Sequence, residues 1–196
     1  MRWRMILVMA CAGLAGGVLA GEQDDARMKA FIAAGREAAD MLVKQIGGEL
    51  RREMEASGVL RGVIVCKYTA PEVANMLSRQ TGMRVTRVSL RPRNPALGFP
   101  DPWEQKTLAE FERRAANGER PAQLEHWELV NEPQGRFLRY MKAIPTQKLC
   151  LNCHGPVEGI PEVIKAQIAA EYPHDRAVGF REGSIRGAVA VKKFAD

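Results

Sequence analysis

The stretch Cys150-Leu151-Asn152-Cys153-His154 constrains this chain more than any other feature of the sequence. Two cysteines three positions apart, followed at once by a histidine, form the C-x-x-C-H pattern of covalent c-type haem attachment. The two sulfurs can bond to the two vinyl groups of one porphyrin, and the histidine can supply an axial imidazole to the iron. The sequence therefore predicts one covalent haem c, with Cys150 and Cys153 as the thioether residues and His154 as the proximal iron ligand.

Three other interpretations of this motif compete with haem attachment. A redox pair of thioredoxin type requires a preceding strand and a helix that opens on the motif, whereas Pro145 and Gly155-Pro156 place it in a loop. A structural zinc site would need Cys66 to complete a Cys3His set, and the adjacency of Cys153 and His154 makes it hard for both to bind one ion. A disulfide between the two motif cysteines would close a very tight ring.

Residues 1–20 have the composition of a secretory signal peptide. Two arginines supply the positively charged start, residues 5–19 form the apolar segment, and cleavage is expected before Gly21. An uncleaved anchor is the alternative, but an apolar run of about 15 residues is shorter than the ~20 needed to span a bilayer. Cys11 as a lipoprotein cysteine would leave almost no apolar segment before it. We therefore expect a periplasmic domain of residues 21–196, without a membrane span in the mature chain.

Export agrees with the motif, because c-type haem is attached outside the cytoplasmic membrane. The mature chain keeps Cys66, Cys150 and Cys153, and haem attachment uses the last two. An odd cysteine in an exported protein needs a partner chain, a buried position or a ligand role, and the residues alone leave these open for Cys66. The formal net charge is +6 without any basic block, which argues against a nucleic-acid partner.

Hydrophobic periodicity and turn residues predict an α+β domain. Helices are predicted over residues 23–57, 71–80, 102–116 and 161–172, and strands over 83–90, 124–130, 136–144 and 183–194. The run 62–68, which carries Cys66, is rich in β-branched residues, and residues 91–103 form a proline-rich irregular loop. Helices packed against one antiparallel sheet give the α+β class, and the late position of the motif does not fit the small all-helical cytochrome c fold.

Local signals predict several boundaries within these elements. Thr69 or Ala70 is expected to cap the second helix, Gly82 to end it, and Asp101 to cap the third. Four basic residues on the strands are predicted to face solvent, with contact of some of them to a haem propionate as the alternative: Arg84, Arg87, Arg139 and Lys142.

Several short motifs recur in an order that is much more specific than C-x-x-C-H alone. They are Cys66-Lys67-x-x-Ala70-Pro71, Val88-Ser89-Leu90-Arg91 with Arg93-Asn94-Pro95, Pro102-Trp103-Glu104, and the late Cys150-Leu151-Asn152-Cys153-His154-Gly155. Together they resemble a family of exported single-haem c-type proteins with a PAS-like fold, first recognised in cyanobacteria and formerly a domain of unknown function. Related domains are fused to histidine kinases and chemoreceptors. The resemblance covers residues 25–194, nearly the whole mature chain.

The resemblance implies a PAS-like antiparallel sheet with flanking helices and a long N-terminal helix. It also implies an iron ligated by His154 and by the distant Cys66, which the cysteine count leaves without a partner. A thiolate donates charge to iron and favours the ferric state, so a low reduction potential is expected. Five other residues are rival candidates for the sixth ligand: Met76, Met83, Met141, His126 and His174.

The proline-rich loop offers candidate contacts to the haem propionates. Arg91, Arg93 and Asn94 lie there, and arginine pairs well with carboxylates. The alternative is a structural loop whose arginines are solvated. Trp103 is expected to be a core residue next to a helix start, and packing on the porphyrin is the less favoured alternative.

These observations favour one-electron transfer or redox sensing in the periplasm, through a redox or signalling protein that the sequence does not identify. The first alternative is a sensor of a diatomic gas, which would bind when a weak sixth ligand leaves; the lesser alternative is the structural zinc protein. An enzyme is not expected, because no distal acid–base residue can be recognised. The long first helix is a candidate surface for a homodimer.

Overall fold

The computed structural model describes residues 15–195, with side chains from Gln23 onward. Cys11 and most of the predicted signal peptide lie outside the described residues. Helix α1 (Ala15–Ser57) continues without a break past Gly47, so the helix predicted over 23–57 is present and begins earlier. In this part of the chain, no helix is both long and apolar enough to cross a membrane.

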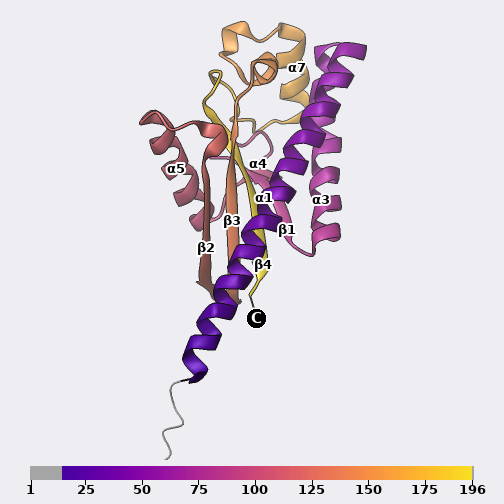
Figure 1. The fold of residues 1–196 in the computed structure, drawn as a ribbon. Helices are drawn as coiled ribbons and strands as arrows, with labels where there is room; N and C mark the ends of the chain where they lie inside the picture. The colour runs from indigo at the N-terminus through magenta and orange to yellow at the C-terminus, as the bar shows by residue number, and fades with distance from the viewer. Residues whose placement is uncertain (1–14, 196) are drawn as a thin grey trace, which may run out of the picture.

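Four antiparallel strands form one sheet in the order β1-β4-β3-β2. They are β1 (Arg84–Val88), β2 (Glu125–Glu132), β3 (Gly135–Pro145) and β4 (Ile185–Phe194). All four predicted strands are therefore present, and the consecutive strands β2 and β3 form an antiparallel hairpin. Together with α1 and the other helices, the sheet confirms the predicted α+β, PAS-like architecture (Figure 1).

The sheet separates two apolar cores because successive side chains of a strand point to opposite faces. On β4, Val189 and Val191 pack in the core with α1 and α3 (Ala70–Thr81). Their neighbours Ala188 and Ala190 pack in the other core with Leu108 and Phe111 of α5 (Pro102–Ala116). Helices thus cover both faces of the sheet.

The β-branched run over 62–68 is helical. It belongs to α2 (Val59–Ile64) and to a π-helix, η1 (Val65–Thr69), which continues directly into α3. Thr69 is therefore already helical and makes no side-chain capping bond, so the predicted cap is wrong, whereas Gly82 ends α3 in the left-handed region with φ 64°. Val63 and Val65 are buried, and burial of such side chains overrides their β propensity.

The remaining helices follow the predicted order. Asp101 caps α5 with a capping box, in which its carboxylate accepts from the Glu104 N–H and Glu104 accepts from the Asp101 N–H. The other elements are α4 (Pro95–Gly98), η2 (Pro121–Gln123), η3 (Lys148–Cys150), α6 (Leu151–His154), η4 (Val157–Gly159) and α7 (Glu162–Glu171). The proline-rich loop is therefore interrupted by the one short turn α4.

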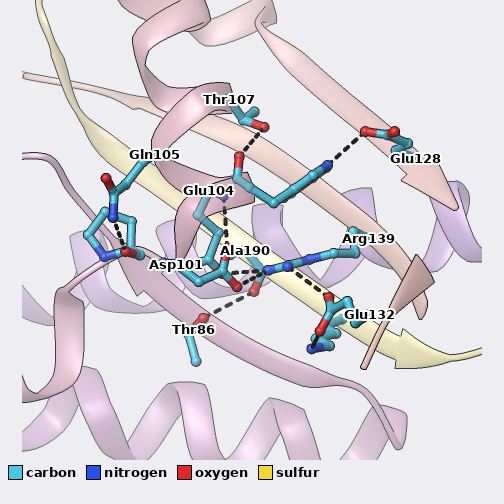
Figure 2. Close-up of polar contacts among 12 residues, drawn as sticks. Thr86, Asp101, Glu104, Gln105, Thr107, Glu128, Glu132, Arg139 and Ala190 are labelled. Carbon is cyan, nitrogen blue, oxygen red and sulfur yellow. Dashed lines mark hydrogen bonds and ion pairs between the residues drawn. The ribbon is translucent and has the colours of Figure 1, made fainter. Parts of the chain in front are cut away.

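Arg139 is buried beneath α5 and does not face solvent, so that prediction is wrong. Its side chain is 3% exposed and forms ion pairs of 2.6 Å with Asp101, 3.1 Å with Glu104 and 3.0 Å with Glu132 (Figure 2). Its guanidinium also lies 4.6 Å from the ring centre of Trp103. The reason is topological: β3 is an inner strand of the sheet, and this position of the strand points towards α5.

Candidate functional site

A cavity beside the ends of β1, β3 and β4 brings together residues that are far apart in the sequence. Cys66 on η1 lines it, and so do Cys150, Cys153 and His154. Strand residues form its floor, and residues of α1, α2 and α3 form an apolar wall. The structure thus collects the four residues that the sequence singled out for a cofactor at one place.

The motif itself is helical and not an irregular loop as predicted. Cys150 ends η3, and α6 then makes one turn that ends at His154. The backbone N–H of Gly155 donates to the carbonyl of Leu151 at 3.0 Å, and a Cβ at position 155 would lie only 2.7 Å from that oxygen. Glycine is required here because the chain turns back so closely on α6.

His154 is oriented by its backbone partner. Its Nδ1 lies 2.7 Å from the carbonyl oxygen of Ala177, which can only accept, so Nδ1 carries the proton. Burial, reinforced by the nearby charge of Arg186, holds the pKa of His154 well below its usual value near 6.5. The imidazole is therefore neutral at pH 7, and the unprotonated Nε2 is the nitrogen available to a metal.

The segment after α7 holds the motif in place. Gly179 N–H donates to the Gly155 carbonyl at 2.8 Å, and Phe180 N–H donates to the His154 carbonyl at 2.9 Å. The Phe180 ring also packs edge-on against the imidazole, with ring centres 6.2 Å apart. These contacts fix the motif's position before any ligand binds.

The two motif cysteines are protonated thiols. Burial raises the pKa of Cys150 and raises that of Cys153 to about 11. A reactive thioredoxin-type cysteine has a lowered pKa, so this environment does not support that alternative. Both cysteines and Cys66 are unpaired, so the structure contains no disulfide between the motif cysteines. Among the described residues, no group of three or more cysteine, histidine or acidic side chains is placed to hold a metal ion, and the zinc site stays an untested alternative.

The three loop residues predicted to contact propionates have different surroundings. Arg93 lines the cavity, but its guanidinium is already engaged by Asp175 at 3.2 Å and by the carbonyl oxygens of Cys153 and Ala177 at 2.5 and 3.2 Å. It therefore ties the motif to the segment after α7.

Arg91 does not line the cavity. Its guanidinium lies 3.8 Å from the ring centre of Phe180 and donates to the Val178 carbonyl at 3.0 Å. Asn94 does line the cavity, and its side-chain oxygen caps α4 by accepting from the Ala96 N–H at 3.1 Å. Propionate contacts from this loop stay a prediction.

Two arginines outside the proline-rich loop also line the cavity, and only one of them, Arg87, was named from the sequence, with propionate contact as its less favoured alternative. Arg87 lies on β1 and shares a strand face with buried Val85, and Arg186 lies at the start of β4. Arg87 was predicted to face solvent, but it is only partly exposed. The sequence offered one signal at this point, the glycine after Arg186. A Cβ at Gly187 would lie 2.3 Å from the Val88 carbonyl, so β1 and β4 approach unusually closely here.

The apolar wall contains a methionine that sequence reasoning also missed. Leu42, Ile46, Leu50 and Met54 recur every four residues on α1 and all line the cavity. A Cβ at Gly62 would lie 3.0 Å from the Met54 sulfur, so the thioether rests against α2. The four-residue spacing of these side chains along α1 was the sequence signal that could have identified Met54. The five rival ligands named from the sequence are absent from the cavity wall: Met76, Met83, Met141, His126 and His174.

Trp103 lies away from the cavity. It is packed against the core beneath α5, its indole N–H donates to Glu128 at 2.7 Å, and its ring stacks on the His126 ring with centres 5.6 Å apart. The structure therefore fits the expectation that Trp103 is a core residue next to a helix start.

Comparisons with known proteins agree with this architecture. The crystal structure of the cyanobacterial heme-protein Tll0287 superposes with a TM-score of 0.60 at 22% identity, over 87% of this chain and 96% of that chain. At this level of identity the likeness establishes the fold. No curated protein matches the chain. The model of the Tll0287-like family matches residues 22–193, so the chain belongs to the Tll0287-like family, as the ordered sequence motifs indicated.

Proposed function

We propose that this protein carries one covalently attached haem c and acts in one-electron transfer or redox sensing in the periplasm. One observation carries the proposal. The C-x-x-C-H motif faces a largely apolar cavity, with a neutral His154 whose Nε2 is free and with Cys66 on another wall of the same cavity. A histidine whose Nδ1 is held by a backbone carbonyl is the usual arrangement of an imidazole ligand.

The residues present fit this cofactor. Cys150 and Cys153 would form the thioethers, His154 would bind the iron through Nε2, and Cys66 would supply the sixth ligand. Apolar side chains of α1 and α2 suit the porphyrin face, because they exclude water from it. A bound haem supplies reversible one-electron chemistry, and the protein contributes the orientation and electrostatics.

The composition of the cavity wall also supports a role without catalysis. The described residues that line it include no aspartate or glutamate, and its histidine is the motif histidine itself. A haem peroxidase needs a distal acid–base group, and this wall offers no carboxylate for that task. We therefore propose that the protein is not an enzyme and exchanges electrons or signals with a protein partner, with α1 as a candidate homodimer surface.

The first experiment is expression of the chain in a host that matures c-type cytochromes. A red periplasmic product whose mass equals the polypeptide beginning at Gly21 plus one haem is expected, with a haem that acidic acetone does not extract. A colourless product of polypeptide mass would overturn the haem assignment. Metal analysis of that colourless product would then test zinc.

Gas sensing is a second candidate function, and the position of Cys66 favours it. Cys66 lies in the π-helix η1, an irregularity that often marks functional sites. A ligand on such a segment can leave the iron if the backbone changes to a regular helix. Addition of carbon monoxide to the reduced protein separates the two candidates. A shifted Soret band supports a labile ligand and gas binding, whereas an unchanged band supports electron transfer.

A further inference from the structure

The cavity has a strong imbalance of charge. Its described lining contains four basic side chains and no acidic one: Lys67, Arg87, Arg93 and Arg186. Buried charges normally occur as pairs, because an unpaired ion that is removed from water loses its favourable hydration. The imbalance therefore indicates either partners just outside the cavity or a ligand that brings negative charge.

Two of the four basic residues have partners behind the cavity wall. Lys67 is paired with Glu171 of α7, and Arg93 is paired with Asp175. Their charges are balanced within the protein itself.

Arg186 has only neutral partners. Its Nη1 lies 3.3 Å from the hydroxyl oxygen of Ser89 and 3.5 Å from the carbonyl oxygen of Arg91, and its guanidinium lies 5.1 Å from the ring centre of Phe180. Burial, together with the nearby charges of Arg93 and Arg87, lowers the pKa of Arg186 to about 10. The negative charge of Asp175 counteracts this shift only in part, and Arg93 already binds that carboxylate.

The side chain of Arg87 forms no hydrogen bond or ion pair with any other residue that the structure describes, although its backbone belongs to the β1–β4 ladder. It faces the cavity from β1, close enough to Arg186 for each charge to disfavour the other. Two guanidinium groups thus face one cavity without a carboxylate between them. This arrangement is unfavourable in the unliganded chain and becomes favourable when two anionic groups enter.

We propose that Arg87 and Arg186 receive the two propionate carboxylates of the haem, in place of the loop residues Arg91 and Arg93. This assignment rests on the proposed function, because it concerns the same cofactor. Guanidinium–carboxylate pairs are charge-assisted and directional, so they select a porphyrin that carries free carboxylates over its neutral ester. They also keep the propionates ionised near neutral pH.

The direct test compares free haem with haem dimethyl ester. Full-length Cys150→Ala/Cys153→Ala protein, which keeps His154 and Cys66, is titrated with each porphyrin. Free haem is expected to bind about 10- to 100-fold more tightly, since a charged hydrogen bond contributes about 1.5–3 kcal/mol. When Arg87→Gln and Arg186→Gln are added to this protein, the two porphyrins should bind almost equally well. Arg84→Gln changes an exposed arginine on the same strand as Arg87 and should leave the preference for free haem unchanged.

A second measurement uses the covalent protein and does not depend on binding by the apoprotein. The midpoint potential of Arg186→Gln is followed from about pH 5 to 8, where a propionate released from its guanidinium titrates. Protonation removes a negative charge and raises the potential, so the variant should show a bend that the wild type lacks. Arg186→Lys should remove the bend, because a cation is restored. Cys66 is present in the wild type and in both variants, so it contributes equally to all of these profiles.

The outcomes separate this inference from the proposed function. Equal binding of haem and its ester by the parent protein, or superimposable potential profiles, would overturn the assignment of Arg87 and Arg186 while leaving haem binding intact. Absence of haem from every variant, the wild type included, would overturn the proposed function instead.

Discussion

The two faces of the sheet bury arginine in opposite ways. Beneath α5, the side chain of Arg139 meets three carboxylates within 3.1 Å, and among its nitrogens only Nε lacks a hydrogen-bond partner. In the cavity on the α1 side, Arg186 meets a hydroxyl and a carbonyl. The first arginine is neutralised by the protein and is part of its architecture. The second keeps a charge that the protein does not balance, and the proposed propionate partner would supply the missing negative charge.

The largest expected effect concerns the cavity face, where we propose that haem is held. Replacement of Cys150 and Cys153 together by serine should abolish covalent haem completely, because no thiol is left for the thioethers. Intact-mass measurement should show the bare polypeptide. Cys66→Ser is the matched control, and its protein should retain the mass of one haem. Equal loss in both variants would show that the sulfurs of the motif have no special role.

The next largest effect is on stability and belongs to the opposite face. Arg139→Met should lower the free energy of unfolding by about 3–5 kcal/mol, since it leaves buried carboxylates without their cation. Arg186→Met in the apoprotein should change the free energy of unfolding by less than about 1 kcal/mol or increase it, since this substitution removes a charge that has only neutral partners. Urea denaturation at pH 7 measures both. Similar losses in the two variants would erase the distinction between the two faces.

The pH dependence of Arg139→Met provides a control for this explanation. In the wild type, burial acts to raise the pKa of Asp101, but the hydrogen bonds from Arg139 and from the Glu104 N–H, together with the charge of Arg139, outweigh burial and lower it. Asp101 therefore stabilises the fold above its unfolded pKa and loses that effect as pH falls. Burial raises the pKa of Glu104 even with the arginine present. In the variant both carboxyls should have raised pKa values. The deficit in stability should therefore be largest at high pH and shrink as pH falls through those values.

This comparison also shows what the sequence could and could not predict. The haem motif, His154 and the Asp101 cap are local signals, in which the chemistry depends on residues within a few positions of one another. The two buried arginines are different, because their surroundings depend on the strand order. Nothing near Arg139 or Arg186 shows that β3 and β4 are the two central strands, or which face of each strand meets the cavity.

The same limit explains why the sequence assigned neither the conformation of residues 62–68 nor the roles of the loop arginines. Residues 62–68 have β propensity, but Val63 and Val65 become buried as a helix, and only the tertiary fold supplies that burial. Arg91 and Arg93 are two residues apart and equally basic. The structure directs one onto the Phe180 ring and the other to Asp175, a partner far along the chain. Composition could select the loop but not the role of each arginine.

A smaller expected effect tests the ligand from η1. Cys66→Met should keep the haem attached but raise the midpoint potential, because a neutral thioether stabilises ferrous iron relative to a thiolate. Cys66→Ala should alter the ferric low-spin spectrum. Met76→Leu is the matched control, since Met76 packs in the core outside the cavity wall, and its spectrum should match the wild type. Unchanged spectra and potential in both Cys66 variants would eliminate Cys66 as the sixth ligand.

The smallest expected effect is that of Met54→Leu, and it decides whether the wall of α1 is passive. Met54 lines the cavity with its sulfur against Gly62, one helical turn before Cys66. If Met54 contributes only packing, its replacement by leucine, which has nearly equal volume, should lower the free energy of unfolding by less than about 1.5 kcal/mol and leave the midpoint potential unchanged. A midpoint potential that is lower in Met54→Leu than in the wild type would instead show that the Met54 thioether binds ferrous iron. The apolar wall would then share the ligand role with Cys66, and the cavity face would depend on two sulfurs, each suited to one oxidation state.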